Sequence, residues 1–396
     1  MLTAIFAVIA LLVLSPPTGL GASQHILWHI VTPGTVNSVA ISRNGSLMAV
    51  GVQVNETAGV VYLIDKGGSV VWSHSIDIAI SSVAISENAS FVAAGGWQLK
   101  GGCPRNLNIT GYHSCPADFY ANGGVYLLSR KGDILWKYDT GNDPVFGVLI
   151  NGSRVVATPV GSSTLIIDKS GELLSTSQYA ETGVVSPDGR YRFVGTGGTL
   201  SLLQADGTLL WNRYMDSPAL ATGISADDST ISIVTNWGVA SYDINGKQLW
   251  NYTSYFSPSS IAVSGNGSRT FAGVWTDWQP SLLVFTSNGN LLQSFQLGIV
   301  HQIGISADDY LVVGSGPRDT GSFSRTSGSV YLLGPPGIMA PTELSLLFAV
   351  LVIAPMVAIA LVVFWKFKLL RFRKPASTSR WDKSNQALRI LAGLSH

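Results

Sequence analysis

The chain has 396 residues, of which 46% are hydrophobic and only 12% charged, and its formal net charge is +1. This hydrophobic content excludes an intrinsically disordered chain. Two cysteines are too few for a disulfide-stapled scaffold. The charge is unevenly distributed: residues 366–396 hold eight basic residues and one acid (+7), which leaves sixteen basic and twenty-two acidic residues (−6) for the rest. We therefore expect no nucleic-acid partner, because phosphate recognition needs a strongly basic surface.

The chain begins with an apolar segment. Residues 2–14 are uncharged and mostly aliphatic, and they are followed by Pro16, Pro17 and small residues up to Ala22. This pattern predicts a secretory signal peptide over residues 1–22. An uncleaved anchor is the alternative, although 13 apolar residues are fewer than the ~20 that span a bilayer.

From residue 23 to residue 334 one pattern recurs: a short apolar strand, a turn glycine and, four positions later, a tryptophan. The turn glycines are Gly68, Gly132, Gly171, Gly207, Gly246 and Gly289, and the residues four positions on are Trp72, Trp136, Ser175, Trp211, Trp250 and Gln293. A unit that recurs at about 40 residues is typical of a solenoid or a propeller.

A second motif lies upstream of the first, a short alternating strand that ends in a polar turn. It occurs seven times, from Val39–Ser42 to Ile303–Ser306. Each unit should therefore form four short strands, and such sheets bury both faces by radial stacking. The last unit lacks an outer strand, whereas Ile26–Ile30 looks like an outer strand with nothing before it. We predict an all-β, seven-bladed β-propeller over residues 23–334, closed by pairing of the N-terminal strand.

The blade motif resembles the PQQ-like repeats of the quinoprotein-like, WD40-like β-propeller superfamily. Tyr62, Leu63, Gly68 and Trp72 match that pattern, and the resemblance covers about Ile26–Leu333. It implies the fold and little about activity, because common folds host many functions. The quinoprotein enzymes of the group have more blades and vicinal cysteines over the cofactor. With seven units and no adjacent cysteine pair, we expect no cofactor, neither PQQ nor calcium.

The C-terminal part looks like a membrane anchor. After a linker over residues 335–343, residues 344–365 carry no charged side chain and would span about 33 Å as a helix. Residues 366–396 form a basic tail that the positive-inside rule places in the cytoplasm. We therefore predict a single-pass type I plasma-membrane protein with its propeller outside. A buried core helix is the alternative.

Two further features fit an extracellular location. Cys103 and Cys115 lie in one insertion and could form a disulfide, free thiols being the alternative. Seven asparagines begin glycosylation sequons. They are Asn44, Asn55, Asn88, Asn108, Asn151, Asn251 and Asn266.

The long insertions all fall on one side of the predicted ring. They are Gln53–Gly59, Gln98–Gly124, Thr276–Pro280 and Gly316–Gly328. Long loops on a rigid scaffold concentrate binding residues, and aromatic side chains favour glycan or protein recognition. The candidates are Trp97, Tyr112, Phe119, Tyr120, Trp237, Trp275 and Trp278. Trp97, Trp237 and Trp275 could instead pack between blades, as we expect of Trp28, Trp72, Trp136, Trp211 and Trp250.

Two classes of function remain open on the sequence. The first is a non-catalytic binding or scaffolding module for a surface protein or a glycan. The second is a propeller hydrolase or oxidoreductase with a carboxylate or cation site at the channel mouth. Residues that could form that site are Asp77, Asp143, Asp216 and His301. They belong to different repeat units and show no ligand spacing, so we favour the binding module.

Overall fold

The structure is a computed structural model. It describes residues 24–100, 119–160, 163–177, 183–186, 190–196, 198–204, 207–253, 258–275, 280–316 and 327–336, with Ala358, Val362 and Trp365. The chain divides into two compact units, Met1–Ile338 and Met339–His396. No helix in the described part of the chain is long and apolar enough to cross a membrane. The apolar run 344–365 lies outside that part except for three residues, which are helical.

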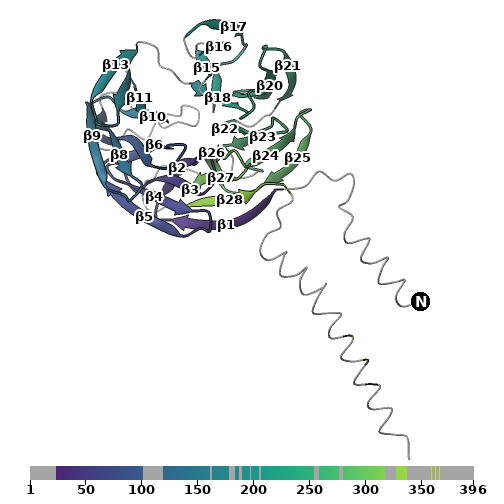
Figure 1. Ribbon diagram of the computed structural model, residues 1–396, viewed down its shortest axis with the longest axis horizontal. Coiled ribbons are helices and arrows are strands. Elements are labelled where there is room, and N and C mark those ends of the chain that lie inside the picture. The colour runs from purple at the N-terminus through teal and green to yellow at the C-terminus, as the bar shows by residue number, and fades with distance from the viewer. Residues whose placement is uncertain are drawn as a thin grey trace, which may run out of the picture. The chain divides into compact units, whose positions relative to one another are not determined.

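The first unit is a ring of seven four-stranded antiparallel sheets (Figure 1). Blade 1 is β2 (Thr35–Ile41), β3 (Leu47–Gln53), β4 (Gly59–Asp65) and β5 (Val70–Ile76). Blade 2 is β6 (Ala79–Ile85), β7 (Phe91–Leu99), β8 (Tyr120–Ser129) and β9 (Ile134–Gly141). Blade 3 is β10 (Val145–Asn151), β11 (Arg154–Pro159), β12 (Thr164–Asp168) and β13 (Leu173–Ser177). Blade 4 is β14 (Gly183–Val185), β15 (Tyr191–Thr196), β16 (Thr199–Gln204) and β17 (Leu209–Tyr214).

The remaining blades follow the same order. Blade 5 is β18 (Ala219–Ile224), β19 (Thr230–Thr235), β20 (Gly238–Asp243) and β21 (Gln248–Thr253). Blade 6 is β22 (Pro258–Val263), β23 (Arg269–Val274), β24 (Leu282–Thr286) and β25 (Leu291–Phe295). Blade 7 is β26 (Ile299–Ile305), β27 (Leu311–Gly316) and β28 (Gly328–Gly334), completed by β1 (His25–Thr32). The prediction of a seven-bladed all-β propeller is confirmed.

The ring closes through the N-terminal strand, as the sequence predicts. β1 pairs antiparallel with β28, with His25 opposite Gly334 and Thr32 opposite Gly328. The pairing removes the two open sheet edges that a broken ring would expose. Because His25 and Gly334 form one pair, the chain enters and leaves the propeller at the same place.

Five repeat tryptophans fasten neighbouring blades together. Trp72 donates its indole N–H to the carbonyl of Arg130 in the next blade at 2.9 Å, and its ring lies against Gly132. Trp28, Trp136 and Trp211 donate to the equivalent carbonyls of Lys66, Lys169 and Ile244, and Trp250 lies against Gly289. Any side chain on these glycines would meet the indole ring at 2.8–3.3 Å. The repeat tryptophans thus pack between blades, as the sequence predicts.

Two units lack this tryptophan, and each departure has a local explanation. Gln293 of blade 6 faces the seam of blade 7, where β28 ends and β1 begins. Its side-chain amide forms hydrogen bonds with both the N–H and the carbonyl of Gln24. Ser175 of blade 3 leaves the turn glycine of blade 4, Gly207, with nothing within 4 Å of its Cβ position. Buried apolar clusters join the blades at the other six interfaces, but among the described side chains none joins blades 3 and 4.

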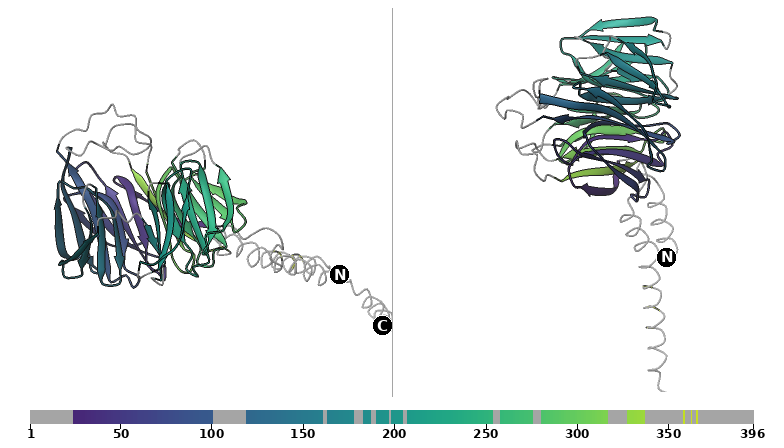
Figure 2. Two further views of the ribbon diagram at one scale, coloured as in Figure 1. Left: turned by 90° about the horizontal axis from the view of Figure 1, so that it is seen from above. Right: turned by 90° about the vertical axis from the view of Figure 1, so that its left-hand side faces the viewer.

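The strands run between two faces of the ring (Figure 2). On the turn face, short turns join first to second and third to fourth strands. Several of these turns bond to one another around the channel: Ala307 N–H to the Arg43 carbonyl, Arg43 N–H to the Glu87 carbonyl, and Asp227 N–H to the Gly265 carbonyl. On the loop face lie the connections from second to third strands and from blade to blade. The chain enters and leaves on the turn face.

Candidate functional site

The loop face carries the long connections between second and third strands, as the sequence predicts. One insertion is shorter than expected, because the β7–β8 ladder continues past a bulge to the pair Leu99 and Tyr120. The connection between these two strands is therefore residues 100–119. Most of it lies outside the described residues, as do residues 276–279 and 317–326.

A β-bulge interrupts six of the seven inner strands at their loop-face ends. The residue that the ladder skips is Asn37, Ser81, Phe146, Leu220, Ser259 or His301. Bulges re-aim side chains and are frequent beside functional sites. Because inner strands line the channel, these six residues surround its mouth. The sequence alternation gave no signal for this ring.

The ring of bulged residues has a polar part and an apolar part. Asn37, Ser81 and Ser259 each donate a hydrogen bond to the carbonyl that precedes the bulge of the next blade. Phe146 and Leu220 have no polar group to donate, and their side chains are 40% and 46% exposed. The polar members hold the blades together, whereas the apolar members are available for contact.

Other exposed apolar side chains lie in the same sector of the loop face. Val160 follows β11, Tyr214 ends β17, and Trp237 lies between β19 and β20, at 52%, 79% and 67% exposure. We call Phe146, Val160, Tyr214, Leu220 and Trp237 the apolar sector; they belong to blades 3, 4 and 5. Among the described residues, Val31 is the one other large apolar side chain exposed near this face.

The sequence candidates divide into packing residues and contact residues. Trp97 and Tyr120 are buried and meet edge to face at 5.2 Å, and Phe119 packs against them. Their cluster borders the apolar sector, because the Tyr120 ring also contacts that of Phe146 at 6.1 Å. Trp237, in contrast, is exposed.

Trp275 is half-buried and meets the ring of His301 edge to face at 4.8 Å. Tyr112 and Trp278 lie outside the described residues. The aromatic candidates that the structure describes therefore do not form one site.

The residues considered for a cation site are not gathered either. The described residues contain no group of three or more His, Cys, Asp or Glu side chains that could hold a metal. Asp77 accepts hydrogen bonds from the Tyr126 hydroxyl and the Lys137 ammonium. The bond from Tyr126, more than that from Lys137, lowers the pKa of the Asp77 carboxyl. Asp216 is exposed and Asp143 half-buried, each between two blades.

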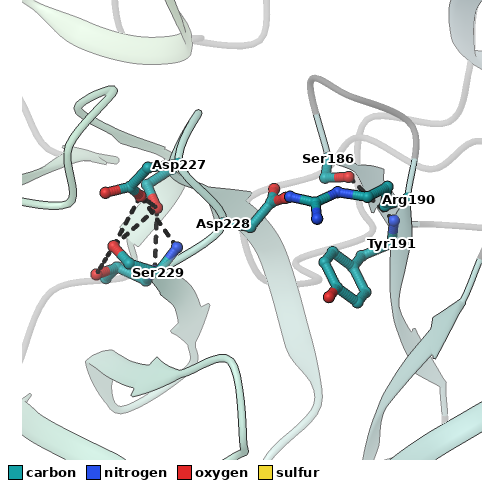
Figure 3. A network of polar contacts seen from close by, with 8 residues as sticks. Ser186, Arg190, Tyr191, Asp227, Asp228 and Ser229 are labelled. Atoms are coloured by element: carbon teal, nitrogen blue, oxygen red, sulfur yellow. Dashed lines mark hydrogen bonds and ion pairs between the residues drawn. The ribbon is translucent and has the colours of Figure 1, made fainter.

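The turn face has its own polar network, between blades 4 and 5 (Figure 3). Arg190 pairs with the buried carboxylate of Asp228 at 2.9 Å, and its guanidinium lies over the Tyr191 ring. The neighbouring Asp227 accepts hydrogen bonds from Ser225 and Ser229. Arg190 reaches blade 5 across the interface and thereby links the two turns, so we assign this network to ring assembly.

The same turn geometry accounts for several sequons. The side-chain oxygens of Asn44, Asn88 and Asn266 accept the N–H of the serine two positions on, each at 3.1 Å. Asp227 makes the same bond to Ser229. The Asn-x-Ser pattern on the turn face is therefore one of the patterns that stabilise this turn.

Asn55 makes the equivalent bond to Thr57 on the loop face. Asn151 and Asn251 lie on strands, and all six sequon asparagines in the described part of the chain are exposed. Asn108, Cys103 and Cys115 lie outside that part.

Comparison with known proteins identifies the fold. No protein-family model and no curated protein matches the chain. Solved structures do match, 1412 chains in all. One is the β-propeller domain of Cps50 (Swd1) from Myceliophteria thermophila, with a TM-score of 0.58 at 14% identity over 79% of this chain and 99% of that one. At this identity the likeness establishes the β-propeller fold alone, and the PQQ-like affiliation remains a prediction.

Proposed function

We propose that the protein is a membrane-anchored, extracellular β-propeller that binds a surface protein or a glycan through the loop face, without catalysis. The observation that carries the proposal is the apolar sector. Exposed aromatic and aliphatic side chains gather over blades 3–5 on the face that holds the long connections. Several exposed apolar side chains on one face are a feature of interaction sites.

The rest of the molecule supports the same assignment. The polar bulged residues and the bonded turns make the ring a rigid platform, and loops on a rigid platform concentrate recognition. Exposed Trp237 and Tyr214 are the residue types that dominate binding energies at interfaces and that stack on sugar rings. We extend the proposal to the signal peptide, the spanning helix 344–365, the plasma-membrane location, the Cys103–Cys115 disulfide and glycosylation of the sequons away from the turn face, Asn55, Asn108 and Asn251.

The test is site-specific photocrosslinking on the full chain in its native membrane. A photoreactive phenylalanine analogue replaces Trp237 or Tyr214, and in a control chain it replaces Ser294, which is exposed on the outer strand of blade 6. We expect one defined adduct, protein or glycan, from both sector positions and none from Ser294.

The adduct then gives a quantitative measurement. Trp237→Ala should weaken binding of the identified ligand by ~2 kcal/mol, about 30-fold, as expected of a central aromatic contact. Equal crosslinking from Ser294, or unchanged affinity in both Trp237→Ala and Leu220→Asp chains, would remove the sector from the binding site.

A further inference from the structure

Every outer strand has, at its turn-face end, two adjacent residues of which all but one, counted over the seven strands, are aliphatic. They directly precede the position of the repeat tryptophan. The pairs are Ile26 and Leu27, Val70 and Val71, Ile134 and Leu135, Leu173 and Leu174, Leu209 and Leu210, Gln248 and Leu249, and Leu291 and Leu292. We call these residues, without Gln248, the aliphatic rim.

A common backbone feature presents these side chains. In all seven outer strands a β-bulge skips the second member of the pair, so that this residue has no partner on the neighbouring strand. Ten rim residues are 39–51% exposed. Ile26, Leu27 and Leu292 are partly buried. Exposed aliphatic residues scattered singly need no explanation, but the same register at one end of every blade forms a belt of separate pairs spaced around the ring.

The chain supplies an argument for what covers this belt. It enters and leaves the propeller on the turn face, at the pair His25 and Gly334. Both directions lead to apolar sequence, residues 2–14 on one side and residues 344–365 on the other. The linker 335–343 can extend at most about 3.6 Å per residue, so the turn face is within roughly 35 Å of the point where residue 344 begins.

Basic side chains stand beside the belt. Exposed basic residues occupy three outer turns next to the rim, at Arg130, Lys131, Lys169 and Lys247. Of the acidic residues in the same turns, Asp168 and Asp243 accept the N–H groups of their own turns, whereas Asp133 and Glu172 are exposed and balance part of the basic charge. Basic side chains flanking aliphatic ones are characteristic of protein segments that lie in the membrane interface.

We propose that the aliphatic rim and these basic turns seat the turn face on the headgroup region of a lipid bilayer. The inference rests on the membrane anchoring in the proposed function. Turns that enter the headgroups by the ~5–10 Å usual for interfacial segments bring the rim, two residues away, to the acyl boundary. The loop face then points away from the membrane, toward a ligand.

The experiment compares two ends of the same outer strand. The full chain is reconstituted into vesicles of phosphatidylcholine and phosphatidylglycerol, and a thiol-reactive fluorophore is attached at Leu210→Cys or, as its partner, at Tyr214→Cys. Leu135→Cys and Asp139→Cys form a second pair on β9 in case one variant fails to fold. The unsubstituted chain, which holds only Cys103 and Cys115, gives the background labelling.

We expect brominated lipid to remove roughly half or more of the emission at Leu210→Cys and Leu135→Cys, because their labels sit at the acyl boundary. Aqueous iodide should quench only the Tyr214→Cys and Asp139→Cys labels. If iodide quenches all four while the chain stays with the vesicles, the seating is wrong and the anchoring survives. If the chain does not associate with vesicles at all, the anchoring in the proposed function fails and the seating fails with it.

Discussion

The turn face and the loop face lie at opposite ends of the same 28 strands, yet their residues and connections differ in how regularly they repeat. On the turn face most blades repeat the turn glycine, the capping side-chain oxygen and the tryptophan contact, and several turns are bonded to one another. On the loop face the connections between second and third strands range from two residues to the long β7–β8 insertion, and the residue at the bulge varies among the blades that have one. Repetition therefore marks the face that assembles the ring, and variation marks the face that we assign to binding. The following predictions test that division.

The largest effect should come from comparing two tryptophans. Trp250 is 8% exposed and packs on Gly289, whereas Trp237 is 67% exposed. Trp250→Ala should lower the free energy of unfolding by ~3–5 kcal/mol, and Trp237→Ala should change it by less than about 0.5 kcal/mol. Urea unfolding of the two variants measures both values. Equal losses would erase the distinction between assembly and binding tryptophans.

A smaller difference should separate two turn glycines. Gly171 and Gly207 have φ of +92° and +88°, but only Gly171 has an indole, that of Trp136, 3.1 Å from its Cβ position. Alanine at either site carries a left-handed backbone cost of ~1–2 kcal/mol. Gly171→Ala should cost about 1 kcal/mol more because the added methyl meets the ring. Identical unfolding midpoints would show that the indole contact contributes nothing.

The interface between blades 3 and 4 offers a gain of stability. Ser175 occupies the tryptophan position there, and the turn glycine opposite, Gly207, is uncovered. Ser175→Trp should raise the free energy of unfolding by ~1 kcal/mol through restored packing, in the usual range of stabilising substitutions. Ser175→Ala is the matched control and should change it little. A loss in the tryptophan variant would mean that this interface differs in geometry from the other six.

The smallest effect concerns the loop-face ion pair of Asp77 and Lys137. The hydrogen bond donated by the Tyr126 hydroxyl lowers the pKa of Asp77, and a hydrogen bond from Lys137 to the Tyr126 oxygen raises the pKa of Lys137. The carboxylate therefore stabilises the fold above its unfolded pKa of ~3.9, and this is lost as pH falls through the folded pKa. The ammonium contributes below ~10.4 and its contribution is lost as pH rises through the folded pKa.

Both side chains are more than a third exposed, so solvent screening keeps the pair below ~1 kcal/mol. Asp77→Asn should accordingly lower stability slightly at neutral pH and flatten the acid limb of a plot of unfolding free energy against pH. Asp139→Asn, a nearby exposed acid on β9, is the control. A larger acid dependence in Asp77→Asn than in the unsubstituted chain would contradict the assigned network.

The sequence predicted the ring well because every blade repeats its signals. Blade number, the order of strands, the closing role of Ile26–Ile30 and the packing role of Trp72 all follow from residues that recur in register. The sequence shows that Ser175 and Gln293 replace the repeat tryptophan, but it does not show which residues lie opposite them. Their consequences depend on Gly207 and Gln24, which lie in other blades.

The candidate site was harder to predict, because it is formed by loop-face residues that differ from blade to blade. Trp97 lies near the end of the second strand β7 and Trp237 just after the second strand β19. Only the β7–β8 extension explains why the first is buried and the second exposed. Phe146 and Leu220 gave no signal, because a bulge shifts side-chain direction without changing composition. The recurring sequons have a second explanation: the turns that Asn44 and Asn266 cap repeat the motif whether or not sugar is attached.

Closure by β1 also sets a schedule for biosynthesis. β1 is synthesised before the other strands of the ring. It has no partner until β28, nearly three hundred residues later, has been made. Contacts so distant in sequence form late and slowly. Until then β1 and β28 are open edges that could recruit other chains. A chain that ends anywhere before Gly328 would leave β1 without its partner strand. The pairing of β1 with β28 therefore distinguishes a complete ring from an incomplete one.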